Sequence, residues 1–455
     1  FMNCVIMAWV NLAMASILEG MFGIPPKQVL LYVALSLAIT AGYSALSGLW
    51  GVAVTDAFQF ALAMLGTIVL AVVVVRLPAI GGLAGLKASL PEWTLRFTPA
   101  IGGTSAGQVA GTFALSASAF FAYVGVQWWA SWYPGSEPGG GGYIAQRMMS
   151  AKDEKHSLYA TLWFTIAHYC VRPWPWILVG LASLVLYPQL GPDQKRLGYV
   201  WAMRDYLPSG LKGMLVASFF AAYMSTISTQ LNWGTSYVIN DFYKRFVKPA
   251  AGERDLVRMS RIVTIVVMAL SLLTTTILAT ISGAWAFIIE AGAGLGLVLI
   301  LRWFWWRINA WSEIAAMVAP LVAYGYLRAA TDVQFPETLY YIVAVTTVVW
   351  IAVTFMTRPA DDETLKRFFR RVHPGGPGWA RVAALVPDVR PDSGYAGLFV
   401  DWIAGVALIY SMLFAVGSFL FGAYGRGFAC LAVAVVSVWL IHRDLSRRGF
   451  AQLTR

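Results

Sequence analysis

A run of hydroxyl side chains interrupts one of the apolar segments of this chain. Within residues 221–245 the sequence places Ser225, Thr226, Ser228 and Thr229 ahead of a polar and basic end. On a helix these positions share one face over two successive turns, so their oxygens are presented together. Hydroxyl, carbonyl and carboxylate oxygens are the ligands of hard cations such as Na⁺. Ser and Thr also donate to the preceding turn or pack between close helices, and the hydroxyls alone favour that structural interpretation.

The composition predicts that this segment lies in a membrane. Of the 455 residues, 59% are hydrophobic and 12% are charged, and the mean hydropathy is +0.66, which is too apolar for a soluble globule. Runs of about 20 apolar residues cross a bilayer as helices, because hydrocarbon offers the backbone no hydrogen-bond partner. We predict an all-α polytopic membrane protein with about twelve spans, near residues 1–23, 27–47, 51–76, 110–133, 157–187, 211–238, 258–282, 284–303, 311–328, 338–356, 397–421 and 427–442.

The net charge of +11 is expected to mark membrane topology rather than a nucleic-acid partner. An excess of Lys and Arg marks the cytoplasmic side of a membrane protein, where it also contacts anionic lipids. The basic residues concentrate in the segments 144–156, 239–257, 304–310 and 357–396 and in the C-terminal tail. The opposite side then carries a sparser set, such as Lys27, Arg76, Lys87, Arg96, Lys195 and Arg196.

No pattern for covalent chemistry accompanies these segments. Cys4, Cys170 and Cys430 form no C-x-x-C motif and the four histidines are scattered, so neither a disulfide framework nor a zinc site is predicted. No paired carboxylates or histidine clusters stand at helix ends, which argues against a membrane-embedded transferase. We therefore do not expect an enzyme, and no obligate protein partner is indicated.

The whole 221–245 segment resembles the sodium-site helix of the sodium/solute symporter family, which includes the sodium/galactose and sodium/proline symporters. That helix carries Ala-x-x-Ser-Ser/Thr, then Leu-Asn, then an Asp-x-Tyr-Lys end. The matching residues here are Ala222, Ser225, Thr226, Leu231, Asn232, Asp241, Tyr243 and Lys244. The resemblance implies that Na⁺ is the coupling ion, held by the carbonyl of Ala222 and the hydroxyls of Ser225 and Thr226.

A second motif supports the resemblance. Residues 46–59, LSGLWGVAVTDAFQ, resemble the start of the family's fifth core helix, where Asp56 matches the carboxylate of a second cation site. In some members this carboxylate joins hydroxyls matching Ser228 and Thr229 in a second sodium site. An ionisable residue in a membrane span suggests a functional role. The alternative is that Asp56 is hydrated near the cytoplasmic end, or caps its helix.

A third motif follows a break in a predicted span. Residues 143–152, YIAQRMMSAK, resemble the cytoplasmic end of the family's sixth core helix. The preceding residues 128–142 contain two prolines and four consecutive glycines, which must interrupt a helix. Such breaks leave backbone groups free to bind solute in transporters, whereas a phosphate loop would need a following Lys-Ser/Thr. We predict Trp129 and Ser131, beside the break, as solute-binding residues.

Two further polar positions are predicted to line the solute site. His168 and Arg172 are four residues apart and share a helix face. In the sodium/galactose symporters, positions matching His168 and the neighbourhood of Glu290 contribute polar contacts to the sugar. An arginine in a bilayer must be paired or hydrated, so Arg172 either pairs with Glu290 or attracts a solute carboxylate. A neutralised pair favours a sugar or polyol, which aromatic faces also suit.

The resemblance implies a LeuT-like core of two inverted five-helix repeats with accessory C-terminal helices. The expected order is core helices three to five, an extracellular loop, the second repeat, accessory helices, a cytoplasmic basic loop, and two final helices with a basic tail. These segments correspond to residues 1–76, 77–109, 110–306, 307–356, 357–396 and 397–455. Because Phe1 opens inside an apolar span, we expect the first two core helices to lie upstream of this sequence.

The predicted function is sodium-coupled symport of a small polar solute by alternating access, in a multi-pass protein of the plasma (inner) membrane. A sugar or polyol is favoured over a carboxylate as the solute. The alternatives are a proton-coupled transporter of the same fold and a symporter-like membrane sensor module. Loss of uptake in Na⁺-free buffer at fixed pH would distinguish sodium coupling from proton coupling.

Overall fold

The structure is a computed structural model that describes residues 2–44, 49–102, 107–109, 112–131, 148–278, 280–391 and 395–448. Within these residues nine helices are long and apolar enough to cross a membrane, or ten if one bent pair forms a single span. Seven of them are simple: α1 (Met2–Phe22), α3 (Leu49–Val75), α12 (Glu253–Ile277), α15 (Ala310–Ala330), α16 (Thr338–Met356), α19 (Tyr395–Leu420) and α20 (Tyr424–Arg448).

The other spans are composite. One runs through α8 (Glu154–Thr165), the π-helix η3 (Ile166–Val171) and α9 (Pro173–Leu186), and another through α11 (Ser209–Ser236) and the π-helix η5 (Tyr237–Val247). The bent pair is α13 (Ile281–Gly292) and α14 (Leu295–Leu301), whose axes differ by 43°. π-helical turns inside longer helices occur often at functional sites, which directs attention to η3 and η5.

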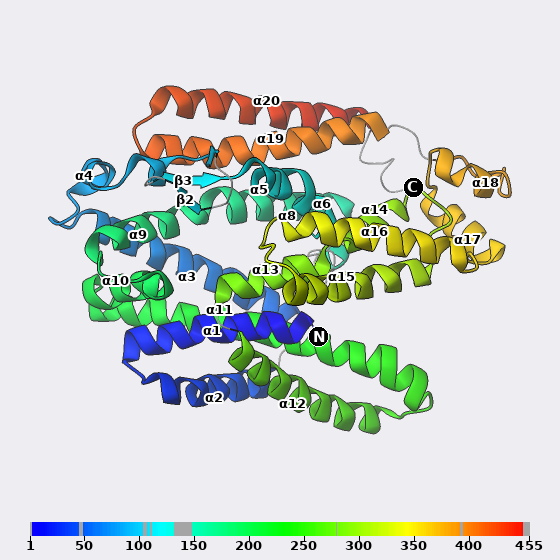
Figure 1. Ribbon diagram of the computed structural model, residues 1–455, viewed down its shortest axis with the longest axis horizontal. Helices are drawn as coiled ribbons and strands as arrows, with labels where there is room; N and C mark the ends of the chain where they lie inside the picture. The colour runs from blue at the N-terminus through cyan, green and yellow to red at the C-terminus, as the bar shows by residue number, and fades with distance from the viewer. Residues whose placement is uncertain are drawn as a thin grey trace. The chain divides into compact units, whose positions relative to one another are not determined.

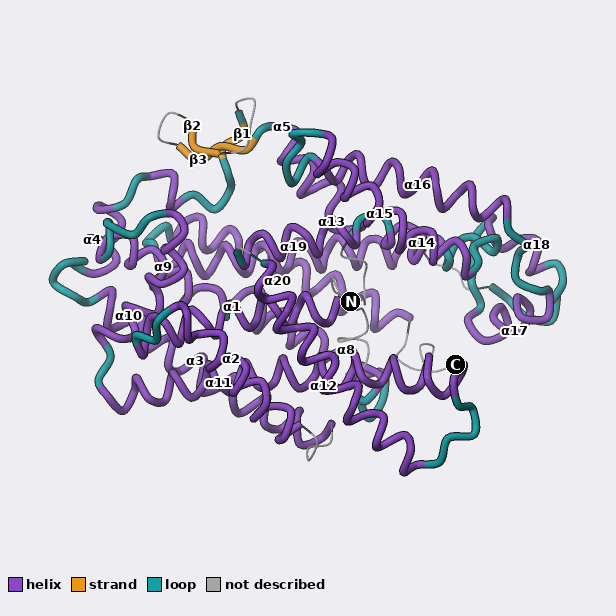
Figure 2. The backbone as a smooth tube through the Cα atoms, turned by 60° about the horizontal axis from the view of Figure 1, so that its bottom comes forward, coloured by secondary structure: helices purple, strands orange, loops and turns teal. Residues whose placement is uncertain are grey.

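Two predicted spans are shorter than expected. The apolar part of α2 (Pro26–Ser44) covers only Pro26–Gly42, and the predicted span 110–133 holds the short elements α5 (Ala117–Phe121), η2 (Ala122–Gln127) and α6 (Trp128–Ala130). Before α5 lies a small sheet of order β1-β3-β2, formed by β1 (Ala100–Ile101), β2 (Gly107–Val109) and β3 (Thr112–Leu115) (Figure 2). Residues 102–112 are rich in Gly, Ser and Thr, which have low helix propensity.

The described chain forms two compact units, each built from segments distant in sequence. The first contains Phe1–Leu95, Thr165–Ala284 and Leu413–Ala429. The second contains Arg96–Phe164, Trp285–Met412 and Cys430–Arg455. The predicted first repeat, 1–76, lies wholly in the first unit, whereas segments of the predicted second repeat, 110–306, belong to both units.

In the first unit, α11 lies between two apolar clusters. On one side it packs with α1, α2 and α12, where Met7, Leu37 and Ile227 are fully buried (Figure 1). The helices interlock because each is apolar on more than one face, as expected for helices buried among others in a membrane.

On the other side, the N-terminal part of α11 packs with α9, with α10 (Gly198–Tyr206) and with the C-terminal part of α3. Gly66 allows α3 to approach closely, since a Cβ atom there would lie 2.9 Å from Cδ1 of Leu215. The end of α3 thus lies beside the beginning of α11, so the two helices run in opposite directions. The first unit also holds α4 (Gly82–Ser89), η1 (Glu92–Leu95) and η4 (Pro192–Leu197).

In the second unit, α15 and α16 form a helical hairpin (Figure 1). Asn309 begins α15 with a capping box: its Oδ1 accepts from the backbone N–H groups of Trp311 at 2.9 Å and Ser312 at 3.1 Å. Such a cap satisfies the orphan donors of a helix start. The hairpin packs against the ends of α6 and α13 through Ala130, Ile289 and Ile342.

The segment 357–396, expected as a cytoplasmic basic loop, contains a small folded element. It comprises α17 (Asp362–Val372), η6 (Pro377–Trp379) and α18 (Ala380–Ala383) around the buried side chains of Leu365, Phe369 and Trp379. Asp361 caps α17 by accepting from the backbone N–H of Thr364 at 2.8 Å, and this hydrogen bond lowers the pKa of the Asp361 carboxyl. Leu365 and Phe369 are four residues apart, so one helical face supplies the core.

Candidate functional site

The predicted sodium ligands lie on one face near the middle of α11. The Thr226 hydroxyl donates to the Ala222 carbonyl, and the two oxygens are 3.1 Å apart. The Ser228 hydroxyl likewise donates to the Ser225 carbonyl at 3.1 Å. Both hydroxyls thus make the back-bonds that the structural interpretation expects. A donating hydroxyl still has lone pairs that can accept, so the Ala222 and Thr226 oxygens remain a pair able to face one cation.

Burial separates the two predicted groups of hydroxyls. Ala222 is exposed and Ser225 and Thr226 are half-buried, whereas Ser228 and Thr229 are buried at 1% and 8% exposure. The first group therefore lies on a face open to other ligands. The second group faces the interior of its unit.

The side chain of Asp56 lies outside the described residues, but its backbone belongs to α3. Gly66 is level with Leu215 of the antiparallel α11. Asp56 is ten positions before Gly66, and Ser225 is ten positions after Leu215. Because each helix rises about 1.5 Å per residue, the backbone of Asp56 comes level with the hydroxyl run of α11.

A buried polar chain fixes the position of α11 beside these hydroxyls. The Tyr223 hydroxyl donates to Oδ1 of Asn11 at 2.9 Å, and Nδ2 of Asn11 donates to Oγ1 of Thr275 at 3.0 Å. Asn11 is fully buried. The chain joins α1, α11 and α12, and it begins at the residue next to the predicted ligand Ala222.

Two further polar contacts continue this attachment. Nδ2 of Asn3 donates to Oε1 of Gln230 at 2.7 Å, linking α1 to α11. Thr235 and Thr264 share a hydrogen bond of 3.0 Å, linking α11 to α12. The sequence analysis missed these residues, although Asn and Gln inside apolar spans are a signal that could have identified them.

His168 and Arg172 come together in η3 and at the start of α9. An Arg172 N–H donates to Nδ1 of His168 at 2.9 Å. Because the guanidinium can only donate, Nδ1 must be an acceptor, and the imidazole is neutral with its proton on Nε2. Pro173 and Pro175 follow, and the Arg172 backbone N–H bonds five residues back to the Ala167 carbonyl at 2.9 Å, as in a π-helix.

Trp129 and Ser131 lie in the second unit at the break between α13 and α14. The Ser131 hydroxyl donates to the Ile289 carbonyl at 2.8 Å, and the Gly294 N–H donates to the Ala130 carbonyl at 3.2 Å. Gly294 has φ +107°, which favours glycine. At Gly296 a Cβ atom would lie only 1.9 Å from the Trp129 carbonyl oxygen, so the two backbones are in direct contact.

Glu290 is the fully buried carboxylate of the same break. Its Oε1 accepts from the Thr338 hydroxyl at 2.5 Å, and its Oε2 is 3.9 Å from a guanidinium nitrogen of Arg328. No hydrogen bond to Oε2 occurs within the described residues. Arg328 and Thr338 come from α15 and α16 and were not predicted. The carboxylate therefore has a cationic neighbour inside its own unit, and its predicted pairing with Arg172 stays a prediction.

The structure thus groups the predicted residues in three places. Ala222, Ser225, Thr226, Ser228 and Thr229 follow α11, and His168 joins Arg172 within the first unit. Trp129, Ser131 and Glu290 gather at the broken helix of the second unit. The second and third places have irregular helical backbone, the kind of segment that binds ions and solutes in transporters, and the first carries a run of hydroxyl side chains on a regular helix.

The sequence pattern of the sodium:solute symporter family matches residues 3–320. The chain belongs to the sodium:solute symporter family. It is 31% identical over 149 residues to a high-affinity proline transporter of Bacillus subtilis, which covers 31% of this chain and 31% of that protein. It is 25% identical over 338 residues to a sodium/mannose cotransporter of Bos taurus, which covers 67% of this chain and 54% of that protein. The chain thus spans less than two thirds of the length of these relatives.

The fold is similar to a solved structure of a Na⁺-coupled sialic acid symporter in a substrate-bound, outward-open state. The TM-score is 0.54 at 20% sequence identity, over 79% of this chain and 72% of that one. The predicted fold class, an all-α polytopic membrane protein with a LeuT-like core, is confirmed.

We predict that Asn11→Leu destabilises the protein by about 1 kcal/mol, because the hydroxyls of Tyr223 and Thr275 lose their shared partner inside the membrane. The measurement is thermal unfolding in detergent, with Tyr223→Phe and the double variant completing a cycle. If the hydrogen bond carries the effect, the double variant will be less destabilised than the sum of the two single variants. Strict additivity would contradict the coupling.

Proposed function

We propose that this chain carries out sodium-coupled symport of a small polar solute across a membrane by alternating access. The observation that carries the proposal is the oxygen pair of Ala222 and Thr226 on α11, 3.1 Å apart in a chain of the sodium:solute symporter family. With Ser225 on the same face, α11 offers three oxygens to one ion. The remaining ligands of a five- or six-coordinate Na⁺ must come from other elements.

The coupling follows from differential binding. An ion shifts a conformational equilibrium only as far as it binds one state more tightly than the other. The chain of Tyr223, Asn11 and Thr275 ties the ligand-bearing turn of α11 to α1 and α12. A displacement of α1 or α12 would therefore move the Ala222 carbonyl, so the quality of the sodium site would differ between the inward-facing and outward-facing states.

A second sodium site is proposed at Asp56, Ser228 and Thr229. Its support is that the backbone of Asp56 comes level with the hydroxyl run of the antiparallel α11. Ser228 and Thr229 are buried, so an ion there would be shielded from solvent and would require a compensating carboxylate.

For the solute we propose a neutral sugar or polyol. The residues proposed to bind it are Trp129, Ser131 and Glu290 of the second unit and, separately, His168 and Arg172 of the first. The sodium/mannose cotransporter matches a larger share of this chain than the proline transporter does, 67% against 31%. Within the second unit, Arg328 lies close enough to offset the charge of Glu290. Half-buried Trp129 offers an aromatic face of the kind that suits a sugar ring.

One observation favours a solute carboxylate instead. Within the described residues Arg172 has no carboxylate partner, and its neighbour His168 is neutral. A guanidinium in that state attracts a carboxylate by a bidentate contact.

The buried Glu290 favours proton coupling as a second candidate function, since an ionisable residue inside a membrane often marks a proton path.

The chain is a multi-pass membrane protein, and we propose the plasma (inner) membrane as its location.

Replacing Ser225 and Thr226 together with Ala is expected to raise the half-saturating Na⁺ concentration for uptake by about tenfold or more, since each lost ligand weakens ion binding. The matched control is Thr274→Ala with Thr276→Ala, which removes two back-bonded hydroxyls from α12. Uptake is measured against Na⁺ concentration at fixed pH. An unchanged Na⁺ dependence would refute the assignment, and uptake that persists without Na⁺ but follows a pH gradient would establish proton coupling instead.

Asp56→Asn is expected to lower the Hill slope for Na⁺ towards one while leaving expression intact, because it removes the charge that compensates a second ion. The measurement is initial uptake rate against Na⁺ concentration for the unmodified and variant proteins. A slope of one in the unmodified protein would remove the second site.

Arg172→Gln is expected to weaken competition by sugars and polyols only modestly, because a neutral ligand loses a single hydrogen-bond donor rather than a bidentate ion pair. The measurement is competition for Na⁺-driven uptake by sugars, polyols and carboxylates, with Arg76→Gln as the control for loss of one exposed arginine. Competition by carboxylates alone, abolished by Arg172→Gln and not by the control, would establish an anionic solute.

A further inference from the structure

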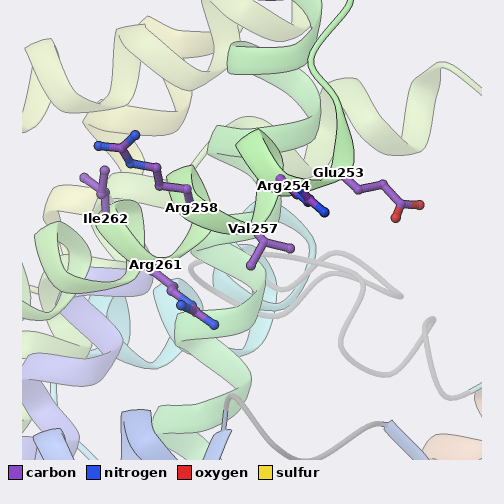
Figure 3. A pocket seen from close by; sticks show the side chains of 6 residues that line it. All are labelled: Glu253, Arg254, Val257, Arg258, Arg261 and Ile262. Atoms are coloured by element: carbon purple, nitrogen blue, oxygen red, sulfur yellow. The ribbon is translucent and has the colours of Figure 1, made fainter.

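The outward face of α12 begins with three arginines. Arg254, Arg258 and Arg261, together with Val257 and Ile262, follow the spacing of a single helical face. With Glu253 these residues line a shallow hollow of about 640 Å³ (Figure 3). Figure 3 shows Arg258 beside Ile262, while the carboxylate of Glu253 extends away from both. We call Arg254, Arg258 and Arg261 the arginine face.

The packing face of α12 is a different one. Val267, Ser271 and Thr275 are buried against the helices of the first unit, and Thr264 bonds to α11. The arginine face is exposed and leads directly into an exposed apolar stripe. That stripe continues to the end of the span and consists of Ile262, Ile265, Val266, Leu270, Leu273 and Ile277, of which Ile277 is 74% exposed.

This order of residues is that of a helix whose first turns stand among lipid headgroups and whose remainder stands among acyl chains. Long basic side chains at the end of a span reach the interface, while the apolar stripe covers the depth of the hydrocarbon. The preceding η5 adds Phe242, Phe246 and Val247, all more than half exposed, next to Lys244 and Arg245. Exposed aromatic and basic residues together are typical of the same interface.

The arginine face lacks a full set of counter-charges within the protein. Among the described residues no carboxylate forms an ion pair with Arg254, Arg258 or Arg261. The neighbouring carboxylate of Asp255 is paired with Lys248 at 2.5 Å. Glu253 offsets one charge at most. Three guanidinium groups on two turns of one helix repel one another, and an external anion would relieve that repulsion.

We propose that the arginine face binds the headgroup of an anionic phospholipid, whose acyl chains lie along the apolar stripe of α12. Arg donors match the oxygens of a phosphodiester in bidentate geometry, and they remain charged at every physiological pH. The stripe supplies the apolar surface that a soluble phosphate could not use. The arginine face is exposed, whereas Thr264 and Thr275 hydrogen-bond to other helices of the first unit, so the site adds to the proposed transport function without depending on it.

The test compares the unmodified protein with Arg254→Gln/Arg258→Gln/Arg261→Gln in nanodiscs of phosphatidylcholine, with and without phosphatidylglycerol. The control variant, Lys27→Gln/Arg76→Gln/Lys87→Gln, removes the same charge from exposed residues of other segments. Native mass spectrometry counts the phosphatidylglycerol molecules that stay bound, and thermal unfolding measures their effect. We expect phosphatidylglycerol to raise the Tm of the unmodified and control proteins, and the arginine variant to bind it about a hundredfold more weakly.

The proposal is overturned if the arginine variant retains phosphatidylglycerol like the unmodified protein, or if the control variant loses it equally. It is also overturned if inorganic phosphate or an acidic peptide raises the Tm through these arginines while phosphatidylglycerol does not. An unchanged Tm in phosphatidylcholine alone verifies that the triple variant folds. If it does not fold, the single variant Arg258→Gln and the salt dependence of phosphatidylglycerol binding to the unmodified protein decide the question, since headgroup binding must weaken as ionic strength rises.

Discussion

Every backbone group inside a bilayer must find its hydrogen-bond partner within the protein, and this requirement determines where the helices of this chain can be interrupted. At the break between α13 and α14, the freed N–H of Gly294 bonds to Ala130 and the carbonyl of Ile289 accepts from Ser131. Where η3 meets α9, Pro173 and Pro175 supply no backbone donor, and the Arg172 N–H bonds to the Ala167 carbonyl of its own helix. Polar groups that could serve a solute thus stand, at these two described places, where the interrupted backbone is satisfied by a second segment or by a π-type bond within its own helix.

The same requirement explains the position of α11. The hydroxyls of Thr226 and Ser228 donate to backbone carbonyls of the same helix, so they provide little attachment to neighbouring helices. Attachment comes from amide side chains at the beginning of the chain, Asn3 and Asn11, which reach Gln230 and Tyr223. The helix that carries the proposed sodium ligands is thus held in register by side chains more than two hundred residues away in sequence.

The sequence predicted what depends on local pattern and missed what depends on distant partners. Apolar length predicted the spans, and the spacing of Ala222, Ser225 and Thr226 placed three oxygens on one face. Nothing local shows that Asn11 joins Thr275, or that Arg328 stands beside Glu290, because each pair is created by packing. The span predicted at 110–133 failed at its start because apolar composition outweighed the Gly, Ser and Thr content of residues 102–112. The 357–396 segment was expected as a basic loop because its many charges drew attention away from the four-residue spacing of Leu365 and Phe369.

The backbone contact at Gly296 limits how two helices of the second unit, α6 and α14, can move past each other. Its Cα lies so close to the Trp129 carbonyl that the two backbones touch without any side chain between them. Side chains can rearrange to let helices slide, but two backbones in contact have nothing to rearrange. The end of α6 and the start of α14 must therefore move together. Gly294, between α13 and α14, is bonded through its N–H to the Ala130 carbonyl, so a displacement of the broken helix would carry Trp129 along with it.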